Sequence, residues 1–249
     1  MNYNQFSNLS CYEEFEIQCT LTGISKVDVL KEIGNQINDY YFFISNDGIF
    51  NWFDLNGNYI EDPGILKELR KVYISKNITK CIIPDSVTCI GCEAFAYCKY
   101  LKTVYIPDNV THIDSDAFWQ CESLETITIP NNIINIGYGA FAQCRSLETI
   151  TIPDSVKYIG YYAFYDCKSL MSITIPNGVI NIGKSAFSFC NSLTSITIPD
   201  SVTSIGDGSF YYCLSLKEVI FKGKTLNQVE QMENYPFGIV NENIIKCEL

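Results

Sequence analysis

The chain has 249 residues, and its 28 acidic and 17 basic side chains give a formal net charge of −11 at pH 7. A chain this acidic, without a basic stripe, is not expected to bind nucleic acid or an anionic membrane surface. No run of 18 apolar residues occurs, so no membrane insertion is predicted. Residues 1–20 lack the pattern of a secretory signal, which makes the cytoplasm the expected location and the cell surface the alternative.

Residues 1–68 predict a small α+β unit that caps one end of the molecule. A capping box at Ser25 to Asp28 precedes apolar residues at helical spacing, and turn residues then separate two apolar runs. The predicted elements of this unit are a loose arm or edge strand at 1–20, a helix near 26–39, and strands at 40–45, at 49–53 and from Tyr59 onward.

Residues 98–221 repeat a 23-residue pattern, Leu-x-x-Ile-x-Ile-Pro-Asp-x-Val-x-x-Ile-Gly-x-x-Ala-Phe-x-x-Cys. A fixed period of 20 to 50 residues is typical of solenoids, propellers and arrays, and the period found here is too short for a helical pair or a four-stranded blade. We therefore expect one strand per coil, with each coil resting on the next. The step is kept by Pro84, Pro107, Pro130, Pro153, Pro176 and Pro199, by Phe95, Phe118, Phe141, Phe164, Phe187 and Phe210, and by Cys98, Cys121, Cys144, Cys167, Cys190 and Cys213.

The coil from Leu101 to Cys121 shows how one repeat is expected to fold. Leu101, Val104 and Ile106 have the strand spacing of a leucine-rich repeat, and Pro107 ends the strand because it cannot donate to a ladder. The Ala-Phe segment that follows the return is expected to be a short helical or irregular turn. One coil cannot bury its inward side chains alone, so stability is expected to come from stacking.

The pattern resembles the BspA-like, or Treponema pallidum type, class of leucine-rich repeats, most plainly in the segment IPDSVKYIGYYAFYDCKSL at 152–170. The resemblance covers about 70–221 and implies a curved solenoid with a parallel sheet on its concave face. It also implies a role in adhesion or protein recognition, and many relatives are surface proteins. The predicted fold is mostly β with short helical or 3-10 turns, divided into an α+β cap at 1–68, a leucine-rich repeat solenoid at 69–221 and a C-terminal cap at 222–249.

Both ends of the solenoid depart from the repeat, as is typical of units that cover an open core. The expected features are a truncated first coil of strand type at Leu69, Val72 and Ile74 with a reversal at 75–77, full coils from Cys81, a helix near 226–232, an Ala-Phe-like segment at 235–238 and a last strand at 244–247.

The repeat cysteines are expected to be buried free thiols, because a free cysteine packs as a small hydrophobe and stacked coils hold the Cβ atoms too far apart for a disulfide. Cys89 and Cys92 form a lone Cys-x-x-Cys pair, and His112, the only histidine, follows Cys89 by one full repeat. Zinc could bind such a group with Asp114 or Asp116 as a fourth ligand, but one pair is a weak signal, and no metal or other cofactor is predicted.

Two surfaces are candidates for binding a protein partner. The first, here called the strand face, consists of the outward residues of the strands and is rich in hydroxyl groups. Exposed β-propensity alone accounts for such residues, and a docking face is the functional alternative. A regular threonine array also resembles ice-binding surfaces, although concave curvature would spoil the fit to a flat lattice. The strand face consists of Lys102, Thr103, Tyr105, Glu125, Thr126, Thr128, Glu148, Thr149, Thr151, Met171, Ser172, Thr174, Thr194, Ser195 and Thr197.

The second candidate, here called the aromatic flank, lies on the return and turn segments. Stacked tyrosines can simply cover the edges of the coils, but tyrosine and tryptophan are also the side chains that anchor partners. The aromatic flank consists of Trp119, Tyr138, Tyr158, Tyr161, Tyr162 and Tyr165, and Phe189, Tyr211 and Tyr212 continue it.

Catalysis has no support in the sequence. A single histidine without a nucleophile beside it gives no triad, and no phosphate-binding glycine loop is present. The predicted function is a non-enzymatic, protein-binding scaffold. A cell-surface adhesin and a structural subunit of a larger assembly are the alternatives.

Overall fold

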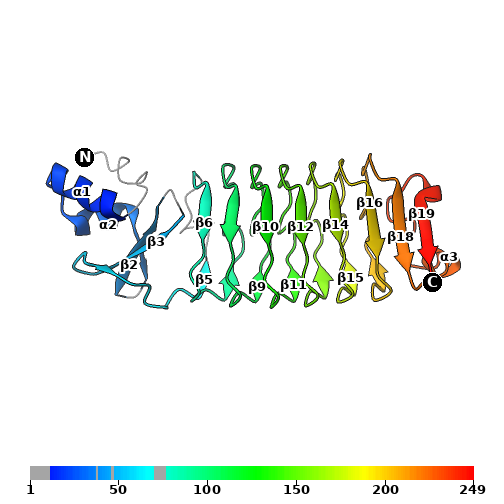
Figure 1. Cartoon of the computed structure of the whole chain (residues 1–249), viewed down its shortest axis with the longest axis horizontal. Coiled ribbons are helices and arrows are strands. Elements are labelled where there is room, and N and C mark those ends of the chain that lie inside the picture. Colours follow the sequence, from blue (N-terminus) through cyan, green and yellow to red (C-terminus); the bar gives the residue numbers. More distant parts are fainter. Residues whose placement is uncertain (1–11, 38, 46–47, 70–76) are drawn as a thin grey trace.

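The computed structural model describes residues 12–37, 39–45, 48–69 and 77–249. Figure 1 shows an elongated row of coils, with a cap of helices and strands at the N-terminal end and a shorter cap at the C-terminal end. Strands of neighbouring coils lie side by side and run parallel. The predicted mostly β solenoid is therefore confirmed.

The N-terminal cap combines helices with an antiparallel sheet, whose strands follow one another in chain order. Two predicted strands and the start of a third are confirmed, each within about a residue of its expected bounds. The elements are α1 (Tyr12–Thr22), α2 (Lys26–Ile33), β1 (Asn35–Ile37), β2 (Tyr40–Ile44), β3 (Phe50–Asp54) and β4 (Tyr59–Ile60).

Strand β2 is apolar throughout because its two faces pack against different parts of the molecule. Tyr41 and Phe43 join the cluster formed with the helices, which includes Phe15. Phe42 and Trp52 point the other way and belong to the core of the solenoid. Successive strand residues alternate between faces, so burial of both faces removes the usual alternation of apolar and polar residues.

Three predictions for the cap are wrong. Residues 12–22 form a helix and not a loose arm or edge strand, because Phe15 is fully buried against the sheet, a contact that local sequence does not reveal. Helix α2 ends at Ile33, well short of its predicted end, since the backbone becomes extended at Gly34 and β1 follows directly. Ser25 is the residue before α2, but its side chain makes no capping hydrogen bond. Residues 1–11 lie outside the described part of the chain.

The tip of the β2–β3 hairpin attaches the cap to the solenoid. The Gly48 carbonyl accepts a hydrogen bond of 2.8 Å from the N–H of Ile82, in the first strand of the strand face. Gly48 has a φ of +83°, and a Cβ atom there would lie 2.4 Å from the Lys80 carbonyl oxygen. Only glycine fits this contact, which covers a strand edge that would otherwise be open.

The strand face is built from one short strand per coil. Cα partners in adjacent strands are one repeat apart, as the sequence predicts, for example Thr126 with Thr149. In the described residues this side comprises the pair β6 (Lys80–Ile82) and β8 (Thr103–Tyr105), followed by the six-stranded sheet β10 (Thr126–Thr128), β12 (Thr149–Thr151), β14 (Ser172–Thr174), β16 (Ser195–Ile198), β18 (Glu218–Lys222) and β19 (Ile245–Glu248).

A second parallel sheet runs along the opposite side, where the sequence predicted only a return segment. Its two-residue strands are too short to show an apolar period. Leu69 pairs with Ile90 in this sheet, so the prediction that Leu69 begins a strand of the first type is wrong. Val72 and Ile74 lie outside the described residues. The strands are β5 (Glu68–Leu69), β7 (Cys89–Ile90), β9 (His112–Ile113), β11 (Asn135–Ile136), β13 (Tyr158–Ile159), β15 (Asn181–Ile182) and β17 (Ser204–Ile205).

The Ala-Phe segments are hydrogen-bonded turns that form a third ladder between coils. The Phe118 N–H donates to the Ala140 carbonyl of the next coil at 2.8 Å, and the Gln120 N–H donates to the Ala142 carbonyl at 2.9 Å. Alternate N–H groups bond within the coil instead, as from Cys121 to the Phe118 carbonyl at 3.2 Å. Three sides of each coil are thus fixed to its neighbours, which satisfies backbone groups that burial would otherwise leave unpaired.

Uniform columns of side chains fill the interior. The repeat phenylalanines stack face to face, with ring centroids 4.9 to 5.9 Å apart and planes within 6° of parallel. The repeat cysteines are free, and Cys98 through Cys190 are buried, as predicted. From Cys121 on, each thiol donates to the carbonyl of the phenylalanine in the preceding coil at 3.1 to 3.3 Å. That bond explains a cysteine where an alanine would also fit.

The C-terminal cap closes the far end of the core. Helix α3 (Leu226–Glu230) begins with a capping box formed by Thr225 and Gln228, and the 3-10 helix η3 (Glu242–Ile244) leads into β19. Phe237 is fully buried, and its carbonyl accepts from Phe210 N–H at 3.0 Å. The predicted helix, Ala-Phe-like segment and last strand are therefore confirmed.

Candidate functional site

The strand face presents the residues that the sequence assigns to it. They are exposed in every coil, with the exception of the half-buried Thr197. The face contains a shallow hollow of about 350 Å³, which is lined by Lys80, Tyr105 and Thr128 among others. Charges are few, and the Lys102 ammonium lies 3.8 Å from the Glu125 carboxylate. Over its central coils the face consists mainly of threonine and serine side chains, beside the exposed Glu125, Glu148 and Met171.

The aromatic flank divides into two parts in the structure. Tyr158 lies on β13, where its register partners are Asn135 and Asn181, and it is therefore on the second sheet. The other members lie on or beside the Ala-Phe turns, and Tyr161 is the most exposed of them at 57%. Sequence spacing placed all six in one surface, but only five share the side formed by the turns.

Ring contacts link the turn side into a continuous chain across several coils. Tyr138 contacts Tyr162 at 5.5 Å, and Tyr162 contacts Tyr165 at 5.7 Å, both edge to face. Tyr165 then contacts Phe189 at 5.4 Å, and Phe189 stacks on Tyr212 at 5.0 Å. Such pairs hold rings in fixed positions without full burial, so a partner would meet a rigid apolar surface.

A hollow of about 350 Å³ lies at the Tyr138 end of this chain of rings, and we call it the flank hollow. It exists because one coil carries small residues, Gly139 and Ala142, where the coil after it carries Tyr162 and Tyr165. Trp119 of the preceding coil closes the opposite wall. The flank hollow is lined by Asp116, Trp119, Tyr138, Gly139, Ala142, Gln143, Tyr162 and Tyr165.

Asp116 supplies the charged group of the flank hollow. It has a φ of +55°, which turns the chain tightly, and its carboxylate lies over Gly139, where a Cβ atom would collide with Oδ1. Partial burial, followed by the nearby Glu93 carboxylate, raises the pKa of Asp116 above its ordinary value. Within the described residues no hydrogen bond or ion pair is found for this carboxylate, so its charge is uncompensated.

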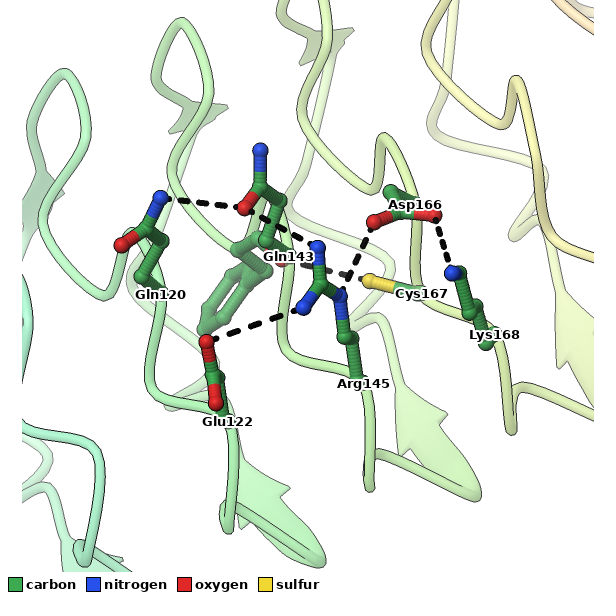
Figure 2. A network of polar contacts seen from close by, with 8 residues as sticks. Gln120, Glu122, Gln143, Arg145, Asp166, Cys167 and Lys168 are labelled. Carbon is green, nitrogen blue, oxygen red and sulfur yellow. Dashed lines mark hydrogen bonds and ion pairs between the residues drawn. The ribbon is translucent and has the colours of Figure 1, made fainter.

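Gln143, which lines the flank hollow, belongs to the polar network drawn in Figure 2. Gln143 Oε1 accepts from Gln120 Nε2 at 3.0 Å and from Arg145 at 3.5 Å. The Arg145 guanidinium lies 3.0 Å from the Asp166 carboxylate and 3.7 Å from Glu122. Arg145 is therefore already neutralised by two carboxylates, and it leaves the charge of Asp116 unopposed.

Sequence reasoning missed the role of Asp116, Gly139, Ala142 and Gln143 in this surface. The signal was present in the repeat. Trp119, Ala142 and Tyr165 occupy the same repeat position in three successive coils, so a small residue lies between two large ones. A small residue between two large ones in a stacked column leaves a gap. Recognising that gap requires knowledge of which repeat positions face outward on this side, and the structure supplies it.

The second sheet brings Cys89 and His112 side by side, as the period predicts. The Cys89 thiol lies 3.5 Å from the Asp114 carboxylate, and the His112 ring contacts the Thr111 hydroxyl at 2.7 Å. Burial, and then Asp114, raise the pKa of Cys89 to about 12, which disfavours the thiolate that zinc requires. No three histidine, cysteine or acidic side chains of the described ranges converge as a metal site.

The repeat region matches the family model for the BspA type leucine-rich repeat region, in six copies over residues 70–168 and 134–241. The chain belongs to the BspA-type leucine-rich repeat family. Among solved structures it is similar to the leucine-rich repeat protein of Treponema pallidum, with 35% identity and a TM-score of 0.57 over 60% of this chain and 71% of that one. This family membership confirms the resemblance drawn from the repeat pattern.

A leucine-rich cell surface protein from Faecalibacterium prausnitzii is also similar, with 25% identity and a TM-score of 0.42 over 69% of this chain and 60% of that one. No curated protein matches the chain. None of the helices in the described residues is long and apolar enough to cross a membrane.

Proposed function

We propose that this BspA-type solenoid is a non-enzymatic module that binds a protein partner through the turn side of its coils. The observation that supports this most is the chain of exposed and half-buried rings from Tyr138 to Tyr212, with a hollow at its Tyr138 end. Interfaces concentrate their binding energy in a few aromatic side chains that fill or form pockets. No cofactor and no nucleic acid is needed for this role.

The strand face is the weaker candidate for the docking surface. Its central columns hold threonine and serine, which are under-represented among the residues that dominate binding energy. The aromatic flank combines large apolar area with fixed ring positions, so ordering it on binding costs little side-chain entropy.

Membership of the BspA-type family supports the surface adhesin as the setting of this binding, in preference to a cytoplasmic scaffold. The two settings differ in whether an external protease can reach the protein. We expect protease added to intact source cells to remove it, whereas retention until the cells are lysed would support the cytoplasmic scaffold.

The docking surface is tested by photo-crosslinking in the source cells. A crosslinking side chain at Tyr161 should form an adduct with the partner, and the same group at Thr149 of the strand face is the matched control. The double variant Tyr162→Ala with Tyr165→Ala should reduce the Tyr161 adduct by more than about tenfold, since loss of one aromatic anchor worth on the order of 2 kcal/mol already weakens binding about thirtyfold. Adducts that form from Thr149 alone would move the docking surface to the strand face.

A further inference from the structure

The flank hollow has the composition of a site for an organic cation. Three of its walls are the rings of Trp119, Tyr138 and Tyr162, and Tyr165 adds a fourth. The face of an aromatic ring carries partial negative charge, which attracts an ammonium or guanidinium group placed over it. Its volume of about 350 Å³ is at the lower end of ligand pockets, and it suits one side chain better than a whole cofactor.

Asp116 provides the charge that a purely apolar pocket lacks. Its carboxylate lines the hollow beside Gly139, is partly buried, and has no ion-pair partner in the ranges that the structure describes. Burying a carboxylate without a counter-ion is unfavourable, and a bound cation would relieve that cost. Arg145, a cation of the bordering network, is held by Glu122 and Asp166.

We propose that the flank hollow binds the side chain of a lysine or arginine presented by the protein partner, with the rings surrounding the cation and the Asp116 carboxylate pairing with it. This rests on the proposed function of the turn side as a docking surface, and it adds the chemistry of the partner. The net charge of −11 favours a basic partner segment for the same reason.

The proposal is tested with small probes and the fluorescence of Trp119. The chain has two tryptophans, and Trp52 is buried in the N-terminal cap at 1% exposure, so a Trp52→Phe background leaves the signal to Trp119. Nα-acetyl-lysine methylamide is titrated at constant ionic strength, with Nα-acetyl-norleucine methylamide as the uncharged control of similar shape. We expect a saturable change with the lysine probe and none with the norleucine probe.

Asp116→Asn is the decisive variant. Asparagine tolerates the positive φ at this position, so the fold should survive, which circular dichroism checks. Binding of the lysine probe should weaken about tenfold, as expected for the loss of a partly desolvated charge beside an aromatic cage. Ala142→Leu, which fills the hollow, should abolish the signal.

Three results would overturn the proposal: equal binding of the norleucine probe, unchanged binding to Asp116→Asn, or no saturable change with the lysine probe. Saturation by a methyl glycoside in place of the lysine probe would assign the hollow to carbohydrate instead. The crosslinking experiment tests the docking surface independently of these probe titrations. If the Tyr162→Ala, Tyr165→Ala variant loses the Tyr161 adduct but the lysine probe does not bind, the turn side remains the docking surface and only the proposed cation site is rejected.

Discussion

The strand face and the aromatic flank are two sides of the same coils, and they differ in how much their columns vary. Along the strand face the register partners Thr149, Ser172 and Ser195 are nearly identical from coil to coil. On the flank, Asp116, Gly139 and Tyr162 occupy one column in successive coils. Uniform columns give a surface that repeats from coil to coil, whereas a varied column gives projections and hollows that a specific partner can fit. The interior is uniform as well, so under the proposed function stability and recognition would depend on different columns.

The largest effect should come from the uniform thiol column. Burial, and then the neighbouring thiol, raise the pKa values of Cys121, Cys144, Cys167 and Cys190 well above the 9.0 of an exposed thiol. The unfolded chain loses these protons above pH 9 while the folded chain keeps them. The free energy of unfolding is therefore undiminished below this pH and falls above it, by up to about 1.4 kcal/mol per pH unit for each thiol.

Urea unfolding under reducing conditions between about pH 8 and pH 11 measures this slope. Cys144→Ala should reduce the slope of the free energy of unfolding against pH by the contribution of one buried thiol. Cys92→Ala, at an exposed site, is the control that should leave this slope unchanged. A flat profile across this range would show that the column does not hold its protons in the folded state.

The next largest effect separates an interior ring from a flank ring. Phe141 is fully buried between Phe118 and Phe164, and Phe141→Ala should lower the free energy of unfolding by about 3–5 kcal/mol. Phe189 is half-buried on the turn side, so Phe189→Ala should cost clearly less. Denaturant midpoints measure both. Equal losses would mean that the flank rings are part of the core and would weaken their assignment to recognition.

A smaller effect is expected in the network of Figure 2. Arg145→Ala removes the guanidinium that lies 3.0 Å from the largely buried Asp166 carboxylate, and Lys168 at 3.7 Å compensates in part. The loss of stability should be about 1 kcal/mol, and it should shrink in high salt because Arg145 is partly exposed. Thermal unfolding at low and high salt measures it, and a salt-independent loss would point to packing of the side chain instead.

The smallest effect is expected on the strand face. Thr149→Ala removes a methyl and a hydroxyl group from an exposed column, so the free energy of unfolding should change by less than about 0.5 kcal/mol. Partner crosslinking from Tyr161 should be unchanged in the same variant. A loss of crosslinking without loss of stability would show that both sides of the coil contribute to binding.

The sequence alone determined the solenoid, its step and its interior. Each inward position recurs once in every repeat, and a coil that cannot bury its own apolar side chains must stack in register. That local rule is why the free thiol column, the first sheet and the C-terminal strand could all be predicted.

Tertiary structure decided the rest. Residues 12–22 are helical because Phe15 reaches a sheet formed later in the chain. The second sheet arises because coils held in register by the core bring two-residue segments within bonding distance. The flank hollow depends on which columns meet on the turn side, since Ala142 opens a space only because Trp119 and Tyr165 lie on either side of it. These features depend on contacts between residues far apart or in different coils, which local spacing does not encode.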